Sequence, residues 1–215
     1  MFFHTFAHKS KQIMRLIIMT EPAFFVEEDQ ILSLLFEQGM DSLHICKTDI
    51  SNTYTERLLS LIPEEYRKKT WIHDCFQLKE KYQLAGIHVD DEKTAVPNGY
   101  KGHAGRTCHD ILRLRELKKQ SNPVFLANTF AATDNPSEDA PYDISTLEEA
   151  ADEGLIDKRV YAYGGVRLEN IRTAKSIGFG GVVVRTDLWS RFNKHNQTNF
   201  DTILRHFEAL RKAIG

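Results

Sequence analysis

Short apolar runs alternate with amphipathic patterns along the chain from residue 14 onward. Apolar runs of strand length occupy residues 15–20, 42–46, 70–73, 85–89, 124–128, 160–162 and 182–184, with a weaker one at 100–106. Apolar residues at helical spacing occupy segments between them, including 28–38, 53–66, 109–119, 145–154, 167–177 and 201–213. Eight strands that alternate with helices at this spacing predict an α/β fold, a single-domain (β/α)₈ (TIM) barrel, rather than an open sheet.

Local signals predict where some of these helices begin and end. Asp74 and Thr107 each precede a helical pattern and are predicted to cap it. Ser145 and Glu148 have the spacing of a capping box at the start of another helix. Gly178 follows a helical pattern and is predicted to end it, because glycine adopts the left-handed conformation common at helix C-termini.

The overall composition narrows the class of protein. The chain has 215 residues, a formal net charge of −2 and 41% hydrophobic residues, which suits one core and gives no general attraction to nucleic acid or membranes. Its three cysteines form no CxxC pair, and no apolar run approaches the roughly 20 residues of a membrane span. We therefore expect a cytoplasmic protein without nucleic-acid or membrane partners. Residues 1–13 lack the apolar region of a signal peptide and are interpreted as an N-terminal extension of a domain spanning 14–215.

Two polar turns follow the last two predicted strands. Gly164 and Gly165 lie between a strand and a helix, where backbone N–H groups can approach an anion closely. Arg185 and Thr186 follow the next strand and supply a guanidinium and a hydroxyl. Because the loops after the seventh and eighth strands of such barrels commonly bind phosphate, these residues predict a site for a phosphorylated small molecule. The alternative is two tight turns in which glycine only relieves backbone strain.

Histidine and cysteine gather at the predicted C-terminal ends of the middle strands, where barrel active sites lie. The polar and cysteine residues there are His44, Cys46, Lys47, His73, Asp74, Cys75, His88, Arg106, Cys108, His109 and Asn128. Imidazole and thiolate are ligands for ions such as Zn²⁺, although no pair has a recognised chelating spacing. Acid–base catalysis by His44, His73 or His88, near the ordinary histidine pKa of about 6.5, is a second interpretation. The third is packing alone inside the barrel.

Four segments, in this order, resemble the thiamine phosphate synthase/TenI superfamily. They are LIIMTE at 16–21, HDCFQLKEKYQLAGIHVDDE at 73–92, RTCHDIL at 106–112 and VYAYGGVRLENIRTAKSIGFGGVVVRTDL at 160–188. The resemblance covers nearly the whole chain from residue 14, and it implies a (β/α)₈ barrel, often a homodimer, in thiamine biosynthesis. Synthase members join a pyrimidine pyrophosphate to a thiazole phosphate with Mg²⁺, giving thiamine phosphate and pyrophosphate. Electrostatic stabilisation and positioning would supply most of the rate of such a reaction.

Several residues stand at functional positions of that family. Gly164 and Gly165 match its phosphate-binding glycine pair. Asp74 matches a Mg²⁺ ligand, which makes Mg²⁺ the expected cofactor and Asp74 the expected metal ligand. His73 stands where the family has an asparagine that contacts pyrophosphate, and His88 matches the histidine of the family's GVHL motif.

The chain departs from the family pattern at other positions. Cys46, Thr48, Cys75, Lys93 and Asn135 stand where the family has Arg, Lys, Arg, Asp and Lys respectively. Lys47 lies one position from the lost lysine, and Asn128 stands where TenI-type members have a histidine. We predict that Cys46, Lys47, Cys75 and Asn128 contact the substrate, with a pyrophosphate site weakened by the lost cations.

Three functional hypotheses follow from these residues. The first is a divergent synthase/TenI-type enzyme that binds a thiazole phosphate or thiamine phosphate. The second is a barrel that binds or responds to a phosphorylated ligand without catalysis. The third is an enzyme with new acid–base or metal chemistry at the histidine and cysteine rim. The long polar loop predicted at 129–143 is functional or disordered in each case.

Overall fold

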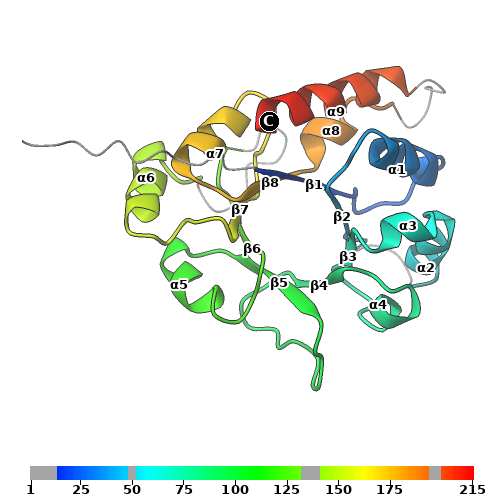
Figure 1. Cartoon of the computed structure of the whole chain (residues 1–215), viewed down its shortest axis with the longest axis horizontal. Coiled ribbons are helices and arrows are strands. Elements are labelled where there is room, and N and C mark those ends of the chain that lie inside the picture. Colours follow the sequence, from blue (N-terminus) through cyan, green and yellow to red (C-terminus); the bar gives the residue numbers. More distant parts are fainter. Residues whose placement is uncertain (1–13, 48–51, 132–140, 194–199) are drawn as a thin grey trace, which may run out of the picture.

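Eight parallel strands form a closed barrel in which each strand pairs with its neighbours in sequence order (Figure 1). The computed structural model describes residues 14–47, 52–131, 141–193 and 200–215. The strands are β1 (Arg15–Met19), β2 (Ser42–Ile45), β3 (Thr70–Ile72), β4 (Gly86–Val89), β5 (His103–Cys108), β6 (Val124–Leu126), β7 (Val160–Ala162) and β8 (Gly181–Val184). The ring closes where β1 pairs with β8, in a register that places Arg15 opposite Gly181. The predicted (β/α)₈ barrel is confirmed.

Helices surround this ring of strands on the outside (Figure 1). They are α1 (Glu28–Glu37), α2 (Asn52–Leu61), α3 (Glu64–Arg67), α4 (Leu78–Lys81), the 3₁₀ turn η1 (Ile111–Arg113), α5 (Leu114–Leu117), α6 (Ile144–Asp152), α7 (Ile171–Ile177), α8 (Thr186–Trp189) and α9 (Asp201–Ile214). The last helix packs against α1, α7, α8 and β1, so the C-terminal end of the chain covers the closure of the barrel. No helix in the described part of the chain is long and apolar enough to cross a membrane.

Two of the predicted helices are wrong in their extent. The helix expected over 53–66 is two helices, because Pro63 lacks a backbone N–H and disfavours a helical conformation in the residue before it. Thr107 belongs to β5 instead of capping a helix. The side chain of Asp110 accepts the N–H of Leu112 and begins the short 3₁₀ turn instead.

Two predicted caps are also wrong, while one helix end is confirmed. Asp74 caps nothing, because α4 begins only at Leu78. The helix α6 begins after Asp143 without a side-chain cap, so the predicted capping box is absent from these described residues. Gly178 ends α7 with a φ of 108°, in the left-handed region. The prediction for residues 1–13, and most of the predicted loop at 129–143, lie outside the described residues.

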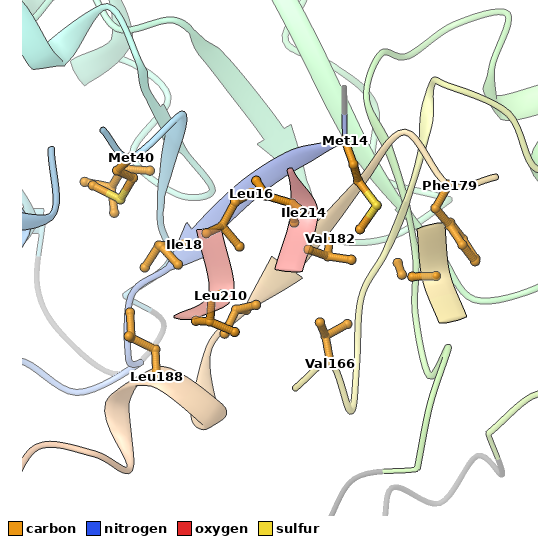
Figure 2. Close-up of a cluster of buried hydrophobic side chains, with 14 of the residues drawn as sticks. Met14, Leu16, Ile18, Met40, Val166, Phe179, Val182, Leu188, Leu210 and Ile214 are labelled. Atoms are coloured by element: carbon orange, nitrogen blue, oxygen red, sulfur yellow. The ribbon is translucent and has the colours of Figure 1, made fainter. Parts of the chain in front are cut away.

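The strands alternate between two apolar layers, as their side chains point in turn to the helices and to the barrel interior. Leu16 and Ile18 of β1 belong to the outer layer, and Figure 2 shows them gathered with Val182, Leu210 and Ile214. The inner layer is smaller and contains Ile17, Met19, Cys46, Phe125, Tyr161 and Val183. Because these side chains fill the barrel interior, small molecules can bind polar groups of the strands only toward the strand ends.

Candidate active site

The loop after β7 contains two successive glycines in left-handed conformations. The φ angles are 87° at Gly164 and 63° at Gly165. A Cβ atom would lie 2.7 Å from the backbone N of Asn128 in the first case and 2.2 Å from the carbonyl O of Phe130 in the second. Both the conformation and the lack of space therefore require glycine at these positions.

This glycine turn is fixed through its carbonyl groups. The Gly164 oxygen accepts the N–H of Phe130 at 3.1 Å, and the Gly165 oxygen accepts the side-chain amide of Asn170 at 2.8 Å. Among the residues that the structure describes, the N–H groups of Gly164, Gly165 and Val166 find no acceptor. Successive N–H groups without acceptors in a turn of this kind are suited to an anion.

A cavity of about 960 Å³ lies at this end of the barrel. Its lining includes Asn128, Gly164, Gly165, Arg185 and Thr186, so five of the predicted site residues meet in one place. Their roles in binding stay predictions. These five residues join backbone N–H groups to the guanidinium of Arg185 and the hydroxyl of Thr186, which together are a donor set for phosphate.

Asp187 connects the two halves of this donor set. One carboxylate oxygen accepts the N–H of Leu168 at 3.1 Å and faces the ring nitrogen Nε2 of His206 at 2.8 Å. The other oxygen accepts a hydrogen bond from Arg191 at 3.2 Å. Burial alone would raise the pKa of Asp187, but the bonds from His206 and the backbone hold it below its ordinary value. The carboxylate thus ties the loop after β7 to α8 and α9.

Three buried histidines from neighbouring strands meet inside the barrel. Nδ1 of His44 lies 3.0 Å from Nε2 of His73, and Nδ1 of His73 lies 2.6 Å from a carboxylate oxygen of Asp90. Nε2 of His88 lies 3.0 Å from the hydroxyl of Thr107. The ring of His88 stacks on that of His73, with centroids 4.5 Å apart.

The histidines are held in different protonation states. Burial, together with the charge of His73, lowers the pKa of His44 well below its ordinary value. Burial and the neighbouring cations do the same to the pKa of His88. Burial would also lower the pKa of His73, but its bonds to Asp90 and Cys46 raise it to about 9. At neutral pH, His73 is therefore an imidazolium that donates to Asp90 and to a neutral His44.

Aromatic rings separate this histidine cluster from the cavity. The ring of Phe125 lies 4.2 Å from that of His88 and 6.0 Å from that of Tyr163, between centroids. Tyr163 itself lines the cavity. The predicted acid–base role of the three histidines stays a prediction, and the structure places them beside the cavity lining instead of on it.

Lys47, Cys46 and Cys75 each form hydrogen bonds with other groups of the protein. The ammonium of Lys47 donates to both carboxylate oxygens of Glu28 at 2.7 Å, in an ion pair away from solvent, and to the carbonyl of Ala23 at 2.9 Å. The backbone of Cys46 is bonded to Thr20. Cys75 donates its thiol to an oxygen of Asn52, and burial raises its pKa. Their predicted contacts with substrate stay untested.

Asp74 has the features of an oxygen ligand for a hard cation. It is half-buried, and among the described residues its Oδ2 atom has no hydrogen-bond partner. Burial and the negative charge of Asp90 raise the pKa of Asp74, so its ionised form is disfavoured. A nearby cation would stabilise that ionised form. The carboxylate of Asp91 instead accepts hydrogen bonds within its own turn, from the N–H groups of Lys93 and Thr94 and from the Thr94 hydroxyl. Carboxylate oxygens are the ligands that Mg²⁺ prefers, so Asp74 with Asp90 fits this ion.

Sequence reasoning did not find several residues of the site. Asp187 followed Thr186 directly but matched no motif, and His206 lies on a helix whose pattern indicated only packing. Tyr163 and Arg191 also line the cavity. Asp90 lies in the segment 73–92 that resembles the family, but no sequence signal pairs it with His73.

Comparison with known proteins places these features in a family. The sequence model described as thiamine monophosphate synthase matches residues 55–188. A thiamine-phosphate synthase from Thermoplasma acidophilum is 25% identical over 138 residues, which are 62% of this chain. The match spans 64% of the length of that curated relative.

Solved structures agree over nearly the full length. The crystal structure of a thiamine phosphate pyrophosphorylase from Bacteroides thetaiotaomicron is 38% identical, with a TM-score of 0.83, over 93% of this chain and 97% of that one. A thiamine phosphate pyrophosphorylase from Pyrococcus furiosus has a TM-score of 0.72 over 95% of this chain and 96% of that one. Its identity of 15% makes this second likeness one of fold alone.

Proposed function

We propose, from the premise that this chain belongs to the thiamine monophosphate synthase family, that it binds a thiazole phosphate or thiamine phosphate in the cavity after β7 and β8. The observation that carries the proposal is the meeting of the Gly164–Gly165 turn with Arg185 and Thr186 on one cavity. A volume of about 960 Å³ suits a ligand of this size, since small-molecule pockets span roughly 300–1,000 Å³.

The donor set explains why a phosphate is the expected group. N–H groups from the glycine turn would bind two of its oxygens, while the guanidinium of Arg185 and the hydroxyl of Thr186 would bind the others. Asp187 carries a negative charge near this site, but Arg191 and His206 engage both of its oxygens. We infer that these partners limit its repulsion of the ligand.

The metal in this proposal is Mg²⁺ at Asp74 and Asp90. When bound, the ion would neutralise charge that develops on a departing pyrophosphate. Asp74 contributes a carboxylate oxygen without a partner among the described residues, and Asp90 contributes a second carboxylate that already orients His73. Lys93, which stands where the family has an aspartate, is exposed and carries a positive charge, so it is not a ligand in this proposal.

Synthase turnover is proposed to be slow. Cys46 and Cys75 stand where the family supplies guanidinium groups, and Lys47 is held by Glu28. Each lost charge-assisted contact removes about 1.5–3 kcal/mol. Two losses would weaken transition-state binding by roughly 10²–10⁴-fold, at about 1.4 kcal/mol for each factor of ten. A phosphate-binding barrel without turnover is the second candidate, and the same engaged Lys47 favours it.

The first experiment incubates the purified full chain with the pyrimidine pyrophosphate, the thiazole phosphate and Mg²⁺, and measures thiamine phosphate. Product above the no-enzyme rate that disappears in Asp74→Ala supports a synthase. No product, with the protein folded and its melting temperature raised by thiazole phosphate or thiamine phosphate, supports the binding barrel. A folded protein that neither ligand protects refutes both.

Variants of the cavity identify where the ligand binds. Arg185→Gln and Thr186→Ala should each reduce the thermal protection by thiazole phosphate, because each removes a phosphate donor. Arg172→Gln is the matched control, since Arg172 is exposed on α7 away from the cavity lining. Equal protection in all three variants would place the ligand elsewhere.

A further inference from the structure

Three adjacent strands of the barrel each direct one buried histidine to a common point. His44 lies on β2, His73 directly follows β3, and His88 lies on β4. One ring nitrogen from each lies within 4.8 Å of the others. We propose that His44, His73 and His88 form a binding site for a divalent transition-metal ion of the Zn²⁺ type, separate from the phosphate cavity.

The outer partners of two of these histidines are those that metal ligands use. Asp90 engages Nδ1 of His73 at 2.6 Å, which leaves Nε2 for an ion. The hydroxyl of Thr107 engages Nε2 of His88 at 3.0 Å, and within the described chain its Nδ1 has no partner. A ligating histidine almost always donates its other ring N–H to a carboxylate, carbonyl or similar group, which fixes the tautomer and the orientation of the ring.

The spacing needs only a modest adjustment to accept an ion. Bond lengths of about 2.0–2.1 Å to a tetrahedral ion place two nitrogens about 3.3 Å apart. Nδ1 of His44 and Nε2 of His73 are already 3.0 Å apart. The ring of His88, now stacked on His73, must turn about its side-chain torsions to direct its nitrogen to the ion. Gly105 leaves room beside it, since a Cβ there would fall 2.5 Å from Nδ1 of His88.

The chemistry of the site selects the class of ion. An ion that binds here displaces the proton of His73, since a ligating histidine must be neutral. Three neutral imidazoles then suit Zn²⁺, Cu²⁺, Ni²⁺ or Fe²⁺, whereas Mg²⁺ prefers oxygen ligands. The side chain of Asp90 is 45% exposed, so an ion can reach His73 from the rim of the barrel. Three protein ligands leave a fourth position for water or a substrate group, as in catalytic sites.

The competing explanation is a plain hydrogen-bond chain from Asp90 through His73 to His44. Such a chain needs no ion and satisfies both nitrogens of His73. It leaves Nδ1 of His88 buried without a partner among the described residues, which is uncommon for a polar atom, whereas an ion would engage that nitrogen. The two explanations differ in whether the purified protein takes up a metal.

The test uses untagged full-length protein, stripped with a chelator and then titrated with Zn²⁺ against a competing indicator. We expect one equivalent to bind, and Mg²⁺ not to displace it. Each of His44→Gln, His73→Gln and His88→Gln should abolish stoichiometric uptake, and Asp90→Asn should weaken it about 10–100-fold through the orientation of His73. His103→Gln is the control, because His103 is exposed on β5.

A second measurement needs no variant and covers the case in which a substitution unfolds the barrel. Zinc X-ray absorption of the wild-type protein should show scattering from imidazole rings. Oxygen ligands alone, no stoichiometric uptake, or uptake that the three folded histidine variants retain would each overturn the proposal. Because uptake is measured without substrate, its failure leaves the proposed thiazole phosphate binding intact.

Discussion

Replacing Lys47 with methionine should destabilise the barrel severely. The side chains of Lys47 and Glu28 are 2% and 0% exposed, and the ammonium lies 2.7 Å from both carboxylate oxygens. Methionine has a similar length but leaves the carboxylate of Glu28 buried without its cation. Breaking a buried ion pair from one side costs about 3–5 kcal/mol, a large part of the stability of a single domain.

Urea unfolding with linear extrapolation measures this loss as a shift of the midpoint at constant slope. The double variant Glu28→Leu with Lys47→Met removes both charges and should recover much of the stability, because an apolar pair of similar volume is often nearly neutral. Lys212→Met is the matched control. Lys212 pairs with Glu208 on the exposed face of α9, where side chains 74% and 59% exposed are screened by water.

The same experiment decides what Lys47 does. If its charge serves the fold, Lys47→Met lowers the urea midpoint strongly, and the double variant still binds thiazole phosphate as the wild type does. A loss of less than about 1 kcal/mol, the range of an exposed pair, would refute the reasoning from burial. Weaker ligand binding in the double variant would restore Lys47 as a substrate contact.

Three further results are expected. In Gly165→Ala, the free energy of unfolding measured in urea should fall by about 1–3 kcal/mol, because the new Cβ would meet the carbonyl of Phe130 at a positive φ. Thiazole phosphate should also lose most of its effect on the melting temperature of this variant. A full thermal shift would contradict the role of the turn. Asp187→Asn should be less stable than the wild type above the unfolded aspartate pKa of about 3.9, because the bond to His206 needs the carboxylate. The difference in stability should vanish as the pH falls through the lowered pKa of folded Asp187. A difference that persists below that pKa would contradict the assigned role of the carboxylate. Burial raises the pKa of Cys108 to about 12, so mass spectrometry should show no alkylation of this thiol at pH 8 until the protein is unfolded.

The sequence by itself determined the barrel and part of its site. Alternation of apolar runs with helical patterns is a local property, and it predicted the eight strands of the barrel. The glycine pair was also readable, because only glycine tolerates the left-handed turn at Gly164 and Gly165. Helix ends were less certain, since Asp110 rather than Thr107 begins the turn after β5.

Only the tertiary structure decided how the charged groups pair. Lys47 finds Glu28 across 19 residues, Asp187 finds His206 across 19, and His73 finds Asp90 across 17. Each group had several partners of the right charge in the sequence. The fold brings one of them within hydrogen-bond distance and removes each pair partly or wholly from water. Burial then makes that pairing strong, because a charge removed from water must be compensated by whatever the fold places beside it.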